Sequence, residues 1–344
     1  METTETSIDM TVERAWADTV YARFALALQE LLAQLDAPQL VVALGGGADS
    51  QTCLDLLDRF RHQHAADAGM QYLGIHLDHH FHPDSSDWAQ VLREDLQRRQ
   101  FPYHIEDLQV VTLARQSKEA TGRAARYQRL AELVEPKALV LLGQHRNDQI
   151  ETFLLQLKRG AGPKGLASMA ELAPLAPASW LWRPLLNLSK ADILRYAKAR
   201  ELVWIEDETN YDTQIERNFL RHQVVPLLEQ RWPQFGDSVL RSAALCAEQE
   251  QVLQELLRDH LQAHMNAAGQ LEIAPLTQHS EAFQRALLRA WLQHQGASMP
   301  SAAQLEQLRL QMLYTTNDAK PVVEWAQFRV WRTRQRYLVL DARP

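Results

Sequence analysis

The sequence predicts a doubly wound α/β domain with a parallel sheet, followed by a second, mostly helical domain. Short apolar runs alternate with amphipathic stretches in the first half of the chain, and polar clusters follow three of these runs. Alternating strands and helices of this length are typical of a parallel sheet covered by helices. Beyond Gly236 such motifs become sparse, and the 344 residues suffice for two domains.

The elements of the first domain follow one another closely. The predicted strands cover residues 39–44, 72–77 and 138–142, and the predicted helices cover 49–61, 84–100, 118–133 and a segment that begins near Asn147. Ligands of such sheets bind beyond the carboxyl ends of the strands. The polar residues after Leu44, Leu77 and Leu142 therefore mark the expected site.

The remaining segments complete the predicted architecture. Residues 173–184 contain three prolines and two tryptophans and predict a loop packed on the first domain. Helices are expected at 190–198, 217–230, 243–264 and 281–295, and short strands at 322–325, 328–331 and 337–340. We divide the chain into an N-terminal extension (1–20), a catalytic domain (21–215), a linker helix (216–235) and a mostly helical C-terminal domain (236–344).

Composition excludes several classes of protein. The two cysteines, Cys53 and Cys246, are far apart and form no CxxC pair, which disfavours a disulfide framework, a structural zinc site and an iron–sulfur cluster. No apolar run approaches the roughly 18 residues that span a bilayer, and the first twenty residues lack the pattern of a signal peptide. We therefore expect a cytoplasmic protein with no membrane partner.

Charge is unevenly distributed along the chain. The whole chain carries 36 basic and 43 acidic residues, a net charge of −7. The segment 115–164 instead holds ten basic and five acidic residues, a local net charge of +5 beside the expected site. Such a segment could bind nucleic-acid phosphates, which the overall charge does not exclude.

A glycine-rich turn, Gly45-Gly46-Gly47-Ala48-Asp49-Ser50, joins the first strand to the first helix. Glycines let the backbone approach a ligand, and the N–H groups at the following helix start favour an anion. The spacing matches neither GxGxxG nor GxxxxGK[ST]. One alternative is a plain strand–helix turn with Ser50 near a cap, and Asp49 could itself cap the helix.

Two further groups of side chains have competing interpretations. Asp148 and Glu151 are three residues apart and share a helix face, as an amine-binding carboxylate pair or as a solvated acidic face. His76, His79, His80 and His82 invite a zinc site, which we disfavour because no cysteine or clear glutamate partner lies nearby.

Together these motifs resemble those of the tRNA(Ile)-lysidine synthetases, N-type ATP pyrophosphatases of the PP-loop superfamily. The similarity covers SGGxDS at 45–50 with Gly45 for serine, HVxHG at 76–80 with His80 for glycine, EAxARxARY at 119–127, HxxDDQxET at 143–152 with Asn147 for aspartate, and LKRGSGPxGL at 157–166. The order holds from about Val41 to Pro226. The resemblance implies an adenine nucleotide alpha hydrolase-like fold in a short form that lacks the family's last C-terminal domain.

The resemblance implies a two-step ligation. ATP adenylates the C2 oxygen of the wobble cytidine of tRNA(Ile) with a CAU anticodon, and the amine of free L-lysine then attacks C2 and displaces AMP. The implied ATP-binding residues are Gly45, Gly46, Gly47, Ala48, Asp49, Ser50, His76, His79 and His145, with Asp49 also at Mg²⁺. Asp49 and Asp148 would be catalytic, Asp148, Glu151 and Arg217 would bind lysine, and Arg123, Arg126, Lys158, Arg159 and Lys164 would bind tRNA.

Two other functions stay open. An adenylating ligase of the same type could use a different acceptor, and a catalytically impaired tRNA-binding paralogue would fit the departures at Gly45, His80 and Asn147. A thiolase is disfavoured by the cysteine count. The sequence leaves the oligomeric state open, a homodimer included.

Overall fold

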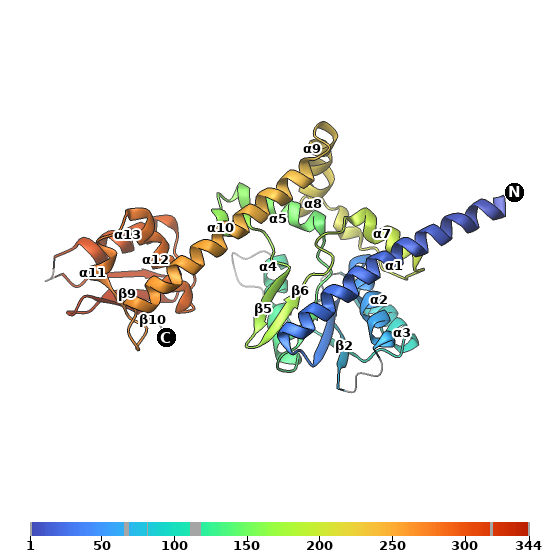
Figure 1. Cartoon of the computed structure of the whole chain (residues 1–344), viewed down its shortest axis with the longest axis horizontal. Helices are drawn as coiled ribbons and strands as arrows, with labels where there is room; N and C mark the ends of the chain where they lie inside the picture. Colours follow the sequence, from blue (N-terminus) through green and yellow to red (C-terminus); the bar gives the residue numbers. More distant parts are fainter. Residues whose placement is uncertain (1, 65–68, 81, 111–117, 317–318, 343–344) are drawn as a thin grey trace. The chain divides into compact units, whose positions relative to one another are not determined.

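The computed structural model describes residues 2–64, 69–80, 82–110, 118–316 and 319–342 of the chain. It divides into two compact units, Met1–Ala244 and Leu245–Pro344 (Figure 1). Among the helices of these described ranges, none is long and apolar enough to cross a membrane.

The first unit is built on a six-stranded sheet in the order β3-β2-β1-β4-β6-β5. Its strands are β1 (Gln39–Leu44), β2 (Gln71–Asp78), β3 (Tyr103–Asp107), β4 (Leu139–Leu141), β5 (Leu172–Ala176) and β6 (Ser179–Trp182). All neighbours pair in parallel except β5, which runs antiparallel to β6 at the edge. The predicted parallel α/β sheet is therefore confirmed.

Helices cover both faces of this sheet because its central strand is apolar on both sides (Figure 1). Leu40 and Val42 of β1 pack with α1 (Glu2–Leu35), α2 (Ala48–Gln63), α3 (Ser85–Arg98) and α7 (Lys190–Ala199). Val41 faces the other way and packs in the cluster that contains Leu130 of α4 (Lys118–Leu133).

The segment after the sheet is more irregular than the sequence suggests. The helix expected at 217–230 is formed by α8 (Glu216–Phe219), a π-helical turn η2 (Leu220–Val224) and α9 (Val225–Arg231). Val225 and Val239 pack on Ile150 of α5 (Arg146–Lys158). The other elements are α6 (Pro163–Leu166), the 3-10 turn η1 (Glu208–Tyr211) and the start of α10 (Phe235–His264).

The loop prediction for residues 173–184 is wrong, because β5 and β6 form a hairpin there. Pro174 lies in β5, whose register with β6 shifts between Pro174 and Ala176. An edge strand tolerates a proline because one side of its ladder needs no donor. Trp182 of β6 is fully buried in the core of this unit.

The second unit is mostly helical, as predicted, and also contains a small antiparallel sheet (Figure 1). Its elements are β7 (Leu271–Glu272), α11 (Ile273–Leu276), α12 (Glu281–His294), α13 (Ala302–Tyr314), β8 (Val322–Trp325), β9 (Phe328–Arg332) and β10 (Tyr337–Ala342). The sheet order is β7-β10-β9-β8. Its core includes Trp291 of α12, Leu308 of α13 and Val330 of β9.

Candidate active site

The predicted site residues gather where β1, β2 and β4 end, at the carboxyl edge of the parallel sheet. Gly143, just after β4, lies against the start of α2. A Cβ atom at Gly143 would come within 2.9 Å of the backbone carbon of Asp49. Only glycine lets the end of β4 approach the glycine-rich turn this closely.

The side-chain hydroxyl group of Ser50 closes the turn from Gly45 to Ser50 with two hydrogen bonds. Ser50 Oγ donates to the carbonyl of Gly47 at 3.0 Å and accepts from the amide of Gly45 at 3.2 Å. Gly46 has a left-handed φ of +85°, and a Cβ atom at Gly45 would meet nothing within 4 Å. The turn therefore has open space at Gly45 beside the start of α2, where helix N–H groups favour an anion.

Asp49 is paired with a cation that comes from far along the chain. Lys190 Nζ lies 2.7 Å from Asp49 Oδ1, and Asn147 Oδ1 accepts a hydrogen bond from the backbone amide of Lys190 at 3.0 Å. The alternative in which Asp49 caps α2 is wrong, because Gly47 is the N-cap and Asp49 lies inside the first turn. The carboxylate side chain of Asp49 faces Lys190 and His145 instead, with His145 Nε2 at 3.9 Å from Oδ2.

Asp148 and Glu151 share one face of α5, as predicted, and both meet arginines of the following helices. Arg217 Nε lies 2.6 Å and Arg221 Nε 2.7 Å from the oxygens of Glu151, whose side chain is 1% exposed. Arg217 and Arg221 also lie 3.3 and 3.2 Å from Asp148 Oδ1. The solvated acidic face considered above is therefore wrong for this pair, because the carboxylates are buried in a four-residue ion network.

Opposing effects set the pKa of Asp148. Burial pushes the pKa up, while the His145 ring, the Arg217 guanidinium, the His145 backbone amide and Arg221 pull it down, so that it lies below its ordinary value. The amide of His145 donates to Asp148 Oδ2 at 3.0 Å. Asp148 is thus held as a carboxylate at neutral pH.

The predicted histidines line the same edge. His76 is buried, and its Nδ1 lies 2.9 Å from the carbonyl of Leu44, which assigns the proton to that nitrogen. Burial lowers the pKa of His76, so the ring is neutral at pH 7. Burial and the nearby Arg126 also lower the pKa of His79. Within the described part of the chain, His76 Nε2 and His145 Nδ1 are buried without a hydrogen-bond partner.

Comparison with known proteins agrees with this geometry. A family described as "PP-loop domain" matches residues 20–228, and a "TilS substrate binding domain" matches residues 271–337. The tRNA(Ile)-lysidine synthase of Idiomarina loihiensis is 57% identical over 89% of this chain and 68% of that protein. The chain belongs to the tRNA(Ile)-lysidine synthase family. The Vibrio cholerae protein of the same name is 42% identical over 92% of this chain and 70% of that protein.

A solved structure supports the fold. The U34-tRNA thiolase NcsA from Methanococcus maripaludis superposes with a TM-score of 0.54 at 15% identity, covering 67% of this chain and 80% of that one. This superposition supports the fold of the chain from its three-dimensional structure. The family assignment itself rests on the sequence identity to the curated relatives.

Within this family, the predicted tRNA-binding residues fall into two sets. Arg123 packs against the Tyr127 ring and donates to its hydroxyl at 3.2 Å, and Arg126 is largely buried near His79. Lys158, Arg159 and Lys164 are exposed near the end of α5 and on α6. The second set is the more exposed to a large polyanion in solvent.

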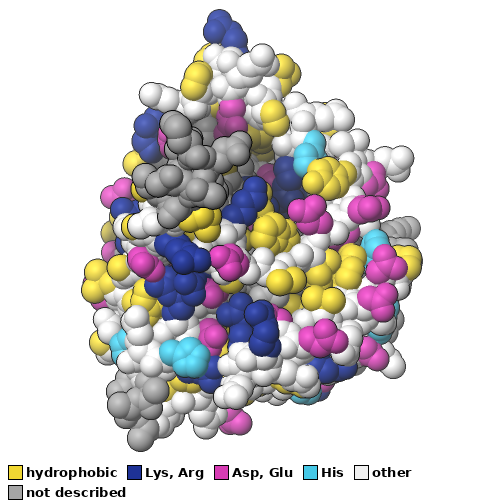
Figure 2. All heavy atoms as spheres, turned by 90° about the vertical axis from the view of Figure 1, so that its right-hand side faces the viewer, with side chains coloured by type: hydrophobic (Ala, Val, Ile, Leu, Met, Phe, Trp, Pro, Cys, Tyr) yellow, Lys and Arg dark blue, Asp and Glu magenta, His cyan; other side chains and the backbone are white. Residues whose placement is uncertain are grey.

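Figure 2 shows Lys and Arg side chains interspersed with Asp and Glu on one face of the molecule. Lys158, at the end of α5, is likewise paired with an acidic residue, Glu216. Part of the basic segment considered above, including Arg115, lies outside the described residues.

Sequence reasoning missed two cations of the site, Lys190 and Arg221. Lys190 follows the helix cap Ser189 and reaches Asp49 across 141 positions of sequence. Arg221 lies one turn after Arg217 in the RNFLR segment and binds the same carboxylates. The only available signal for Arg221 was its spacing from Arg217, since residues four apart share a helix face.

Proposed function

We propose that this chain joins free L-lysine to C2 of the wobble cytidine of tRNA(Ile) with a CAU anticodon. ATP first adenylates that base with release of pyrophosphate, and lysine then displaces AMP. The observation that carries this proposal is the meeting of three groups at one sheet edge in a chain 57% identical to a named synthase: the glycine turn, the Asp49–Lys190 pair and the Asp148–Glu151 pair.

The glycine turn suits the phosphates of ATP. The open space at Gly45 and the helix start at Ala48 offer backbone donors, and Lys190 adds a positive charge at the same place. In this proposal Ser50 does not bind phosphate directly. Its hydroxyl group is hydrogen-bonded to Gly45 and Gly47 and holds the backbone of the turn in shape. His76, His79 and His145 would border the nucleotide.

Asp49 is the residue that would hold Mg²⁺. Its side chain is 29% exposed and presents one oxygen to Lys190 and the other toward His145, so an ion could reach it from solvent. Magnesium needs only one or two protein carboxylates and takes the rest of its oxygens from phosphate and water. Bound there, it would neutralise charge on the leaving pyrophosphate. Lys190 would then be released toward the phosphates.

Lysine would bind at Asp148 and Glu151, where two guanidinium groups now balance the two carboxylates. A substrate ammonium could replace Arg217 at Glu151, and the freed Arg217 could bind the substrate carboxylate. Asp148, kept ionised by its surroundings, would bind the ammonium beside Glu151 and hold the nitrogen in place, and the ammonium would lose its proton to solvent before the amine attacks.

The tRNA would contact the exposed cations Lys158, Arg159 and Lys164 beside α5. Arg126 suits a different role from the one its motif suggested. Burial lowers the pKa of Arg126, and its Nε has no hydrogen-bond partner in the described ranges. It lies near His79, which suggests a contact to the nucleotide or to the flipped base.

The decisive experiment measures pyrophosphate release from ATP and incorporation of labelled lysine into an unmodified tRNA(Ile) transcript. The matched control is the same transcript with its wobble cytidine replaced by uridine. Release that needs the cytidine, together with lysine incorporation, supports the proposal. Release without tRNA points to another acceptor, and tight tRNA binding without release points to an impaired paralogue.

A further inference from the structure

Three side chains with metal-binding atoms meet where β2 and β3 end. Asp78 is the last residue of β2 and lies opposite Asp107, the last residue of β3, in the parallel pairing. His80 follows two residues later with a left-handed φ of 52°. One ligand atom from each of Asp78, His80 and Asp107 lies within 4.8 Å of the others.

The His80 ring lies between the two carboxylates. Its Nδ1 is 3.2 Å from Asp78 Oδ2, and its Nε2 is 3.1 Å from Asp107 Oδ1. The Asp78 side chain is only 4% exposed, whereas His80 and Asp107 are accessible. Asp78 Oδ1 accepts from the His80 amide at 2.8 Å, whereas the buried Oδ2 forms no well-aligned hydrogen bond within the described ranges and faces only the His80 ring nitrogen. A buried carboxylate oxygen with no aligned donor is costly, and a bound cation would offset that cost.

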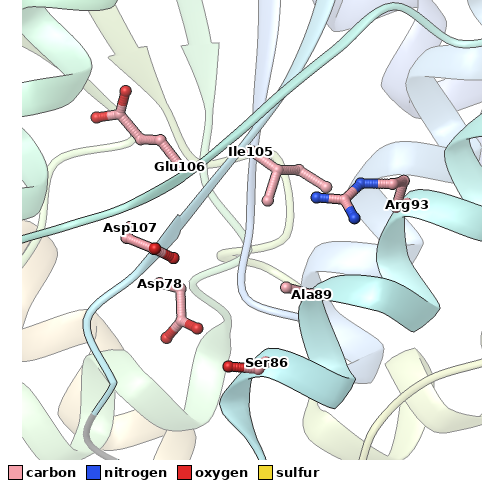
Figure 3. Close-up of a pocket in the computed structure, with 7 residues that line it drawn as sticks. All are labelled: Asp78, Ser86, Ala89, Arg93, Ile105, Glu106 and Asp107. Carbon is pink, nitrogen blue, oxygen red and sulfur yellow. The ribbon is translucent and has the colours of Figure 1, made fainter.

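The same carboxylates line a cavity of about 340 Å³. Its other walls come from Ser86 and Arg93 of α3 and from the end of β3. Figure 3 shows Asp78 and Asp107 next to each other near Ser86. The cavity leaves room for water molecules to complete the coordination of an ion.

We propose that Asp78, His80 and Asp107 form a binding site for a divalent transition-metal cation, with Zn²⁺ the best match. Two carboxylate oxygens and one imidazole nitrogen leave a fourth, tetrahedral position open to water. The imidazole disfavours Mg²⁺ and Ca²⁺, which prefer oxygen alone. The two carboxylates balance the charge of the ion.

This site is separate from Asp49 and from the proposed reaction. It depends on His80, which stands where the family motif has glycine. The four histidines of the segment do not form a site together, because the partners of His80 come from the ends of two strands. A bound ion would tie the loop that carries His79 to β3.

The test uses the full chain after removal of metal with a chelator. Zn²⁺ is titrated calorimetrically in millimolar Mg²⁺, and Co²⁺ reports coordination through its visible absorption. We expect one ion per chain that is lost in His80→Gly, with affinity lowered by about 100-fold or more, because one of three protein ligands is gone. Glycine fits the left-handed φ of position 80, so this variant keeps its fold, as its melting temperature will show.

His82→Ala is the matched control. His82 lies in the same loop, stacks on Trp88 and is not part of the cluster, so its loss should change the Zn²⁺ affinity by less than about twofold. The helical pair His260 and His264 could bind a second ion weakly, and the difference between wild type and His80→Gly isolates the site proposed here.

Absence of saturable Zn²⁺ binding by the wild type, or equal binding by His80→Gly, overturns the proposal. His80 would then only pair with the two carboxylates. Because binding and spectra are measured without ATP or tRNA, this outcome is independent of lysine transfer.

Discussion

The ammonium group of Lys190 lies 2.7 Å from the carboxylate of Asp49. The pair joins the first turn of α7 to the first turn of α2, and the Asn147 side chain holds the Lys190 backbone from the start of α5. Three helices that begin at the carboxyl edge of the sheet thus place one positive charge at the glycine turn. An anion bound at that turn would meet Lys190 directly.

Replacing Lys190 therefore tests the phosphate site. We expect Lys190→Ala to lower kcat/KM for ATP by about 10- to 100-fold, because a charge-assisted contact to the phosphates is lost. Pyrophosphate release at saturating tRNA and lysine measures it. Lys198→Ala, an exposed lysine of the same helix, is the matched control. An unchanged kcat/KM in Lys190→Ala would show that this lysine only balances Asp49.

The ion network around Glu151 predicts a loss of stability. Glu151→Gln removes one of the two carboxylates that Arg217 and Arg221 share, leaving Asp148 alone to balance both, and should lower the free energy of unfolding by about 3 kcal/mol. This is the low end for a broken buried pair, because both arginines keep some contact with water. Urea denaturation measures it. Glu216→Gln, which breaks only an exposed pair with Lys158, should have no measurable effect.

Substitutions at two neighbouring positions of the glycine turn should affect the free energy of unfolding differently. Gly46→Ala should lower the free energy of unfolding by about 1–2 kcal/mol, because φ is +85° and the new Cβ would lie 2.8 Å from Ile205 Cδ1. Gly45→Ser restores the serine of the family motif into open space, and we expect it to leave stability unchanged.

Gly45→Ser should also lower the KM for ATP by about fivefold, since an added hydrogen bond contributes about 1 kcal/mol. Thermal melts and ATP titrations of both glycine variants separate the two effects. A higher KM in Gly45→Ser would mean that this position carries no phosphate contact.

The sequence-based prediction succeeded where a local pattern marks a strand end. The apolar runs before Gly45 and Gly143 identified β1 and β4. The rule that parallel sheets bind ligands beyond the carboxyl ends of their strands then located the site. It failed at β3, whose residues 103–107 mix polar and apolar side chains at the sheet edge. Lys190 and Arg221 were missed because each pairs with a carboxylate far away in the sequence, and the spacing of neighbouring residues does not indicate such a contact.

Exposed cations beside α5 predict the salt dependence of tRNA binding. The double substitution of Arg159 and Lys164 by alanine should weaken binding and make the slope of log K against log salt shallower by about 1–2, since fewer counterions are released. Lys137→Ala is the control, because Lys137 precedes β4 at the opposite edge of the sheet. Equal slopes for the double variant and wild type would move the tRNA surface elsewhere.

The surroundings of Asp148 predict how stability depends on pH. Since its pKa in the folded chain lies below its ordinary value, the ionised carboxylate stabilises the fold above about pH 4. This contribution is lost as the pH falls through the folded-state pKa. In Asp148→Asn the free energy of unfolding should be lower at pH 7 and should fall less steeply with pH below about 4.

Urea denaturation between pH 8 and pH 3 measures both effects of Asp148→Asn. Above about pH 7.5 the two proteins should show parallel dependences on pH, because Asp148 is ionised in the folded and unfolded states alike. This range serves as the internal control, with His145, Arg217 and Arg221 still facing position 148. Equal slopes for both proteins below pH 4 would contradict the depressed pKa and with it the role of Asp148 as an ionised carboxylate that binds the lysine ammonium.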